Sequence, residues 1–116
     1  MGALITVVET SPFTRRAEKI LTVEERKDLI DFLAANPLEG EEIVGTGGVR
    51  KVRFASHGKG KSGGVRVIYY YYDDSMPLFA LLVYGKGEQS NLTPDQKRVV
   101  TTLAATLKAM HKRSGK

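Results

Sequence analysis

The residues in this sequence best suited to chemistry are cations placed in segments that alternate like β-strands. Lys51 and Arg53 alternate with apolar residues in segment 49–55, so both cations lie on one face if the segment is extended. Arg66 opens a second alternating segment, and a third ends in a tyrosine and a lysine that share a face. Pairing of these segments predicts one cationic surface with a tyrosine at its edge. Its members are Lys51, Arg53, Arg66, Lys86 and, at the edge, Tyr84.

Such a surface suits the cleavage of an RNA phosphodiester by the neighbouring 2′-OH. The reaction needs a base for the hydroxyl, stabilisation of charge on the non-bridging oxygens and an acid for the leaving 5′-oxygen. In a cluster of cations the neutral form of a lysine is favoured, which lets it act as a base, while arginine stays charged and can brace the phosphorane. The same side chains can also hold phosphates without cutting them, and the residues alone leave both functions open.

The composition predicts a single domain over 1–116 and excludes several kinds of site. The chain has 116 residues, a formal net charge of +5, no cysteine and two histidines. A chain of this size can bury one core without staples. Without cysteine there is no disulfide framework or thiolate nucleophile, and ligands for a transition metal are scarce. We therefore expect no cofactor and no metal. No apolar run approaches a membrane span or a secretory signal, which favours a cytoplasmic protein without a membrane partner.

The charge is unevenly distributed along the chain. Residues 1–42 hold five basic and nine acidic side chains, whereas residues 43–116 hold thirteen basic and four acidic ones. No carboxylate lies between Glu42 and Asp73. A stretch of this kind attracts polyanions such as nucleic acid, although a solvated basic face is the simpler interpretation. The residues predicted to contact RNA beside the catalytic candidates are Arg50, Lys59, Lys61 and Tyr84.

The elements that must position these residues follow from periodicity and capping signals. The pattern predicts a strand at 4–8, a short helix to residue 20, and a second helix that begins with a capping box at Thr22 and Glu25 and ends at Pro37. Three strands follow at 49–55, 65–72 and 78–84, joined by loops short enough for antiparallel hairpins. A last helix starts at 93, and 111–116 is predicted to be a frayed basic tail.

This element order predicts an α+β fold: a strand, two helices, a three-strand antiparallel meander and a C-terminal helix against a small antiparallel sheet. The run of four tyrosines from Tyr69 to Tyr72 places two rings on each face of its strand. Because apolar residues precede the run, we expect most of these rings to pack in the core rather than to stack on bases.

Four stretches together resemble a HigB-like member of the RelE/ParE toxin superfamily. They are GTGGVRKVR at 45–53, GKGKSGGVRVIYY at 58–70, LVYGK at 82–86 and LTPDQK at 92–97. The resemblance covers nearly the whole chain, including the order of its elements. It implies a RelE-like fold and the toxin of a bacterial type II toxin–antitoxin pair, acting as a ribosome-dependent mRNA interferase that cuts codons in the A site. It also implies three partners: the ribosome, mRNA and a cognate antitoxin, HigA-like and with a helix-turn-helix domain.

The resemblance also implies roles for individual residues. The family's basic positions fall on Lys51 or Arg53 for the base, on Arg66 for stabilisation of the phosphorane and on Lys86 as the nearest candidate acid. Two positions depart from the RelE pattern. Gly87 stands where RelE has a second basic residue, and Thr93 falls near the tyrosine that RelE stacks on the substrate base.

Two other classes of function remain as alternatives. One is a non-catalytic module that binds RNA or the ribosome, and the other is a ParE-like inhibitor of DNA gyrase. The basic cluster on the predicted strands favours the interferase over the gyrase inhibitor.

Overall fold

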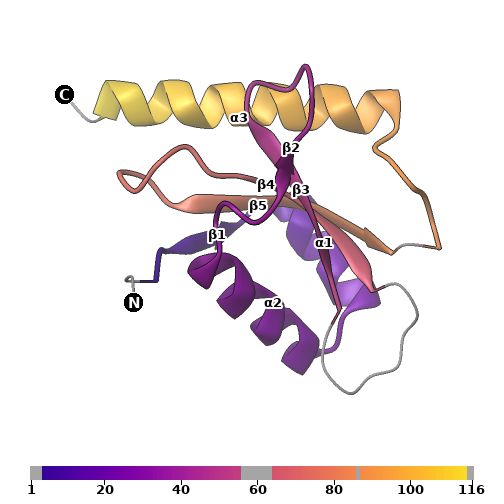
Figure 1. Ribbon diagram of the computed structural model, residues 1–116. Helices are drawn as coiled ribbons and strands as arrows, with labels where there is room; N and C mark the ends of the chain where they lie inside the picture. The colour runs from indigo at the N-terminus through magenta and orange to yellow at the C-terminus, as the bar shows by residue number, and fades with distance from the viewer. Residues whose placement is uncertain (1–3, 56–63, 86, 115–116) are drawn as a thin grey trace.

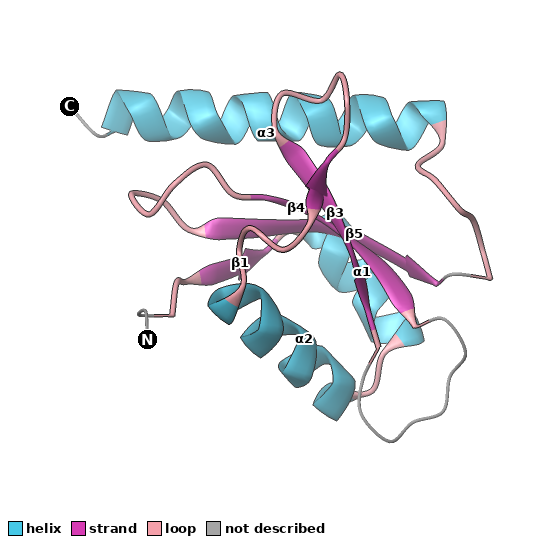
Figure 2. Cartoon of the chain, viewed as in Figure 1, coloured by secondary structure: helices cyan, strands magenta, loops and turns pink. Residues whose placement is uncertain are grey.

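The computed structural model describes residues 4–55, 64–85 and 87–114, which form three layers (Figure 1). A five-stranded sheet lies in the middle, with α1 (Ser11–Ile20) and α2 (Val23–Ala35) on one face and α3 (Pro94–Ser114) on the other (Figure 2). The predicted α+β fold is therefore confirmed. In chain order the strands are β1 (Val7–Glu9), β2 (Glu41–Glu42), β3 (Val49–Phe54), β4 (Val65–Tyr70) and β5 (Leu78–Gly85).

The sheet has the order β1-β5-β4-β3-β2 and differs from the expected one at both edges. The predicted meander of β3, β4 and β5 pairs antiparallel as expected, but β1 pairs parallel to β5. β1 can pair parallel to β5 because a long connection, which contains the two helices and the other strands, lies between them in sequence. At the opposite edge, β2 forms a short antiparallel pair with β3, where the strand pattern of the sequence predicts no strand.

The helix starts follow the capping signals of the sequence. The Thr22 hydroxyl accepts from the backbone N–H of Glu25 at 3.0 Å, and the Glu25 carboxylate accepts from the backbone N–H of Thr22 at 2.8 Å. Thr93 and Gln96 form the same reciprocal pair at the start of α3, at 3.1 and 3.0 Å. Each pair satisfies backbone donors that a helix start otherwise leaves open.

The prediction of a frayed tail is wrong for residues 111–114, which continue α3. Nε2 of His111 lies 3.0 Å from Oγ of Ser75 in the β4–β5 connection. The ammonium groups of Lys108 and Lys112 lie 4.8 and 6.0 Å from the centre of the Tyr72 ring. These contacts hold the last turns of the helix against the end of β4.

The two faces of the sheet bury separate apolar clusters. Tyr69 packs with α1 and α2, while Tyr70 packs with α3, so neighbouring rings of β4 point to opposite layers as alternation predicts. Both rings are buried, whereas Tyr72 is 38% exposed. The expected core role is therefore confirmed for Tyr69 and Tyr70.

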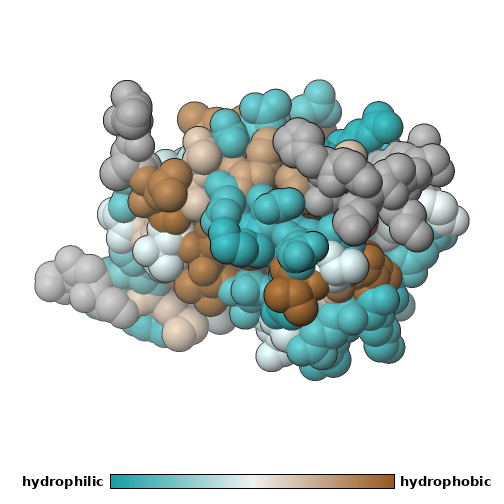
Figure 3. Space-filling model, turned by 90° about the horizontal axis from the view of Figure 1, so that it is seen from below, coloured by the Kyte–Doolittle hydropathy of each residue, from teal (hydrophilic) through white to brown (hydrophobic). Residues whose placement is uncertain are grey.

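The layer formed by α1 and α2 faces solvent on its outer side. Seen from below the view of Figure 1, hydrophilic residues alternate there with small apolar patches (Figure 3). Single exposed apolar residues such as Val23 and Leu38 are ordinary on a protein surface. Among the described residues, no helix has the length and apolar character needed to cross a bilayer.

Candidate functional site

The α3 face of the sheet changes character along β3. Val49 is fully buried against α3, together with Val100 and Ala104 of that helix. The next side chains of β3 on the same face are Lys51, which is partly buried, and Arg53, which is exposed. One end of this face is thus apolar and covered, and the other end is polar and open.

The strand register places two arginines directly opposite each other at the open end. Arg53 of β3 pairs with Arg66 of β4, and Arg66 pairs in turn with Tyr84 of β5. Opposed residues in such a ladder have Cβ atoms roughly 4.5–5.5 Å apart, and like charges at that spacing destabilise the sheet. An anion that bound both guanidinium groups would offset this repulsion. We call Lys51, Arg53 and Arg66 the cationic face.

A glycine keeps β3 and β4 close together beside the cationic face. Gly64 precedes β4 with a φ of +60°, a conformation that favours glycine. A Cβ atom at this position would lie 2.2 Å from the carbonyl oxygen of Phe54. Any larger residue would push the strand ends apart, just where Arg53 and Arg66 pair.

The linker between β5 and α3 supplies one further contact, which sequence reasoning missed. Nζ of Lys51 donates a hydrogen bond to Oδ1 of Asn91 at 3.2 Å. The two residues are 40 positions apart in the chain. A single amide in a polar loop carries no sequence signal that assigns it to a particular lysine.

Tyr84 lies within the site but is buried, with 1% of its surface exposed. Burial raises the pKa of its phenol, and the charge of Arg66 opposes this effect. The hydroxyl donates to the backbone oxygen of Ser90 at 3.5 Å. The ring was expected at the edge of the surface, but its burial offers no open face for stacking on a base.

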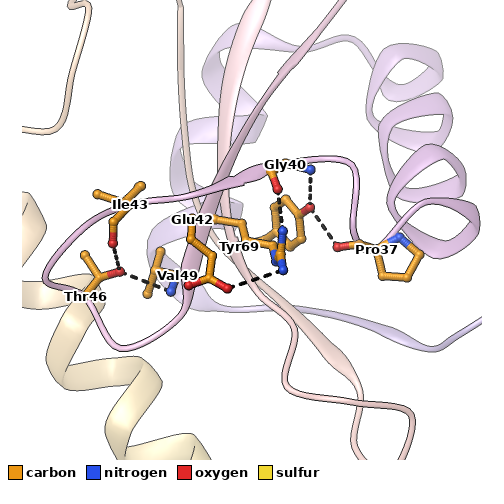
Figure 4. A network of polar contacts seen from close by, with 8 residues as sticks. Pro37, Gly40, Glu42, Ile43, Thr46, Val49 and Tyr69 are labelled. Carbon is orange, nitrogen blue, oxygen red and sulfur yellow. Dashed lines mark hydrogen bonds and ion pairs between the residues drawn. The ribbon is translucent and has the colours of Figure 1, made fainter.

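Arg50 is predicted to contact RNA, but the structure places it on the opposite face of β3. Its Nη1 donates to the carbonyl oxygen of Gly40 at 2.5 Å, and its Nη2 lies 3.5 Å from the carboxylate of Glu42 (Figure 4). Its side chain is 18% exposed. Alternation along β3 separates Arg50 from the cationic face, and its guanidinium already binds protein oxygens.

Three of the predicted site residues, Lys59, Lys61 and Lys86, lie outside the described residues, as does His57. Within the described ranges 4–55, 64–85 and 87–114, no group of three His, Cys, Asp or Glu side chains is arranged to hold a metal ion. The side chains that the described part of the site brings together are cations, an amide and a buried phenol.

Comparisons with known proteins relate the chain to one group. A family model described as the RelE toxin of the RelE/RelB toxin–antitoxin system matches residues 7–114. The fold is similar to the structure of an E. coli toxin RelE mutant, with two arginines replaced by alanine, in the free state. That similarity has a TM-score of 0.53 at 16% sequence identity and covers 75% of this chain and 88% of the other. At this identity the structural likeness supports the fold, and the family match supports the relationship.

Proposed function

Because this chain belongs to the RelE family of toxins from toxin–antitoxin systems, we propose that it is a ribosome-dependent mRNA endonuclease with the cationic face as its active site. The single observation that carries the proposal is the opposition of Arg53 and Arg66 across β3 and β4. A protein gains no stability from such a pair, whereas a phosphodiester placed between the two strands would be held by both guanidinium groups.

The proposed reaction is an internal transesterification of RNA. The 2′-oxygen loses its proton and bonds to the adjacent phosphorus, the bond from phosphorus to the 5′-oxygen breaks, and that oxygen takes up a proton. The products are a 2′,3′-cyclic phosphate and a free 5′-hydroxyl. Atoms and charge balance with no metal ion and no external oxidant or nucleophile.

The role of each cation follows from whether its side chain can release a proton. Arginine stays protonated under ordinary conditions, so Arg53 and Arg66 bind the phosphate and stabilise the charge of the phosphorane. Lysine can release its proton, so among the described cations Lys51 is the candidate base. The resemblance to the family implies Lys86 as the nearest candidate for the leaving-group acid, and this role stays a prediction from the sequence.

The proposal includes the partners that such an activity requires. The substrate is mRNA in the A site of the ribosome, which places the toxin in the cytoplasm. A cognate antitoxin holds the toxin inactive, and the HigB-like sequence features favour a HigA-like antitoxin with a helix-turn-helix domain. The net charge of +5 favours association with ribosomal RNA as well as with the message.

The test is cleavage of a defined mRNA on programmed ribosomes, mapped by primer extension. We expect cuts at the A-site codon with the wild-type protein and none with Arg66→Ala. The matched control is Lys27→Ala, which also removes one positive charge but lies on α2, on the far side of the sheet. An mRNA with a single 2′-deoxy nucleotide at the cut position should stay intact.

Each contrary result has a distinct meaning. An uncut message despite confirmed ribosome binding would overturn the nuclease and leave a module that only binds RNA. DNA damage with intact mRNA after expression in cells would point to gyrase instead. Cleavage of the 2′-deoxy message would overturn the proposed transesterification but not the site.

A further inference from the structure

The contact between Lys51 and Asn91 fixes the orientation of the amide. An ammonium group only donates hydrogen bonds, so the amide oxygen of Asn91 must face Lys51. A neutral lysine amine still has N–H groups to donate, and its lone pair then points elsewhere. The 3.2 Å hydrogen bond can therefore form whether Lys51 is charged or neutral, and in both states it fixes the position of Nζ.

Asn91 is itself held by the first turn of α3. Nε2 of Gln89 donates to the backbone oxygen of Asn91 at 2.8 Å and to Oε1 of Gln96 at 2.7 Å. Gln96 is fixed in turn by its reciprocal hydrogen bonds with Thr93. The amide that meets Lys51 thus projects from a segment anchored to a helix cap.

The other end of the linker is anchored to the sheet and to α1. The Glu88 carboxylate accepts from the backbone N–H of Gly85 at 2.7 Å and pairs with the guanidinium of Arg16. The hydroxyl of Tyr84 reaches the backbone oxygen of Ser90. Contacts on both sides of Asn91 therefore define its position relative to β3.

We propose that Asn91 is a positioning residue that holds the Lys51 amine over the row formed by Arg53 and Arg66. A lysine side chain is long, and ordering it costs conformational entropy. The hydrogen bond to Asn91 meets part of this cost before the substrate arrives. The linker, and not only the sheet, thereby belongs to the active site. This inference rests on the proposed nuclease function.

The test is a double-mutant cycle on the single-turnover rate of mRNA cleavage at saturating toxin. The variants are Asn91→Ala, Lys51→Met and their combination, and Ser90→Ala is the neighbouring linker control. We expect Asn91→Ala to lower the rate roughly 10- to 100-fold because a small misplacement of a reacting group has effects of this size. Ribosome affinity and the unfolding midpoint should stay at their wild-type values.

The cycle separates positioning from a general effect on the linker. If Asn91 acts through Lys51, the double variant is as slow as Lys51→Met alone, since no amine remains to be positioned. The inference would be overturned if the rate of the double variant fell by the product of the two single effects. A wild-type rate for Asn91→Ala or for Lys51→Met would overturn it as well. A wild-type protein that cuts no mRNA would instead overturn the proposed function itself.

Discussion

Arg50 and Arg53 lie three residues apart on β3 and have opposite surroundings. The guanidinium of Arg50 binds the oxygens of Gly40 and Glu42 on the face toward α1 and α2. Arg53 is exposed on the α3 face, where its cross-strand neighbour is another arginine. Identical side chains on one strand therefore serve a structural network in one case and an open cationic surface in the other.

The network around Arg50 is closed by a buried tyrosine. The hydroxyl of Tyr69 accepts from the backbone N–H of Gly40 at 2.8 Å and donates to the carbonyl oxygen of Pro37 at 2.8 Å (Figure 4). A Cβ atom at Gly40 would lie 2.8 Å from that hydroxyl, so the backbone approaches it as only glycine allows. Arg50 then binds the carbonyl oxygen of the same glycine.

The acceptors around a cation therefore decide its role more than the run of basic residues to which it belongs. The backbone oxygen of Gly40 and the carboxylate of Glu42 bind the guanidinium of Arg50 on its own face of the sheet, which makes its charge part of the fold. Arg53 is opposed by a like charge, which makes its surroundings suited to an anion from outside.

Reversal of the charge at the open face should have the largest effect. Arg53→Glu opposes a carboxylate to Arg66, so we expect the cleavage rate to fall at least about 10²–10³-fold, as when a group that stabilises the transition state is lost. The same change replaces a repulsive cross-strand pair with an attractive one and should raise the free energy of unfolding by about 0.2–1 kcal/mol. Cleavage assays and urea unfolding measure the two effects. A loss of both activity and stability would contradict the distinction.

Loss of the Arg50 side chain should lower stability and leave the cleavage rate at its wild-type value. Arg50→Ala removes charge-assisted hydrogen bonds to Gly40 and Glu42, and we expect it to lower the free energy of unfolding by about 1.5–3 kcal/mol. Urea denaturation of Arg50→Ala and Arg50→Met separates the hydrogen bonds from the packing of the aliphatic stem, because the methionine keeps most of that stem. Unchanged stability in both variants would show that the network contributes nothing.

Removal of the Tyr69 hydroxyl should lower the free energy of unfolding by less than the loss of Arg50 does. Tyr69→Phe leaves the N–H of Gly40 and the carbonyl of Pro37 without their partner, and we expect a loss of about 1 kcal/mol. The hydroxyl should stay protonated until well above neutral pH, since burial raises the pKa of Tyr69. Tyr72→Phe is the matched control because Tyr72 is exposed and its ring contacts do not require the hydroxyl. Equal losses in the two variants would argue against the network.

The smallest effect concerns the carboxylate that tethers the linker beside the open face. Hydrogen bonds from the backbone N–H of Gly85 and from the guanidinium of Arg16 lower the pKa of Glu88 from its ordinary value of 4.5. A lowered pKa stabilises the fold above the ordinary value, and this stabilisation is lost as the pH falls through the lowered one. Wild type should therefore exceed Glu88→Gln in unfolding free energy at pH 7 by less than about 1 kcal/mol, as expected for a surface pair. This difference in unfolding free energy should disappear as the pH falls below the lowered pKa of Glu88. A gap that is constant with pH would contradict this tether.

Local signals in the sequence predicted most of the elements. Strand alternation placed Lys51 and Arg53 on one face, and the Thr-x-x-Glu and Thr-x-x-Gln boxes marked two helix starts. The same alternation places Arg50 on the other face, whereas the run of basic residues to which it belongs carries no information about the face. The strand register, by contrast, depends on which strands become neighbours, and only the structure shows that Arg53 opposes Arg66.

What the sequence did not predict depends on the path of the chain in space. The parallel pairing of β1, the contact of Asn91 with Lys51 and the burial of Tyr84 all join segments distant in sequence. No periodicity encodes such contacts. The continuation of α3 to residue 114 likewise depends on its contacts with the β4–β5 connection and with Tyr72.

The roles of Arg50 and Arg53 can be compared in one experiment. Single-turnover cleavage of ribosome-bound mRNA is measured for Arg50→Ala and Arg53→Ala at a temperature where circular dichroism shows both to be folded. We expect a rate at least about 100-fold below wild type for Arg53→Ala, the loss expected for a group that stabilises the transition state, and a wild-type rate for Arg50→Ala. Equal losses in the two variants, or a greater loss in Arg50→Ala, would contradict the assignment of the cationic face as the active site.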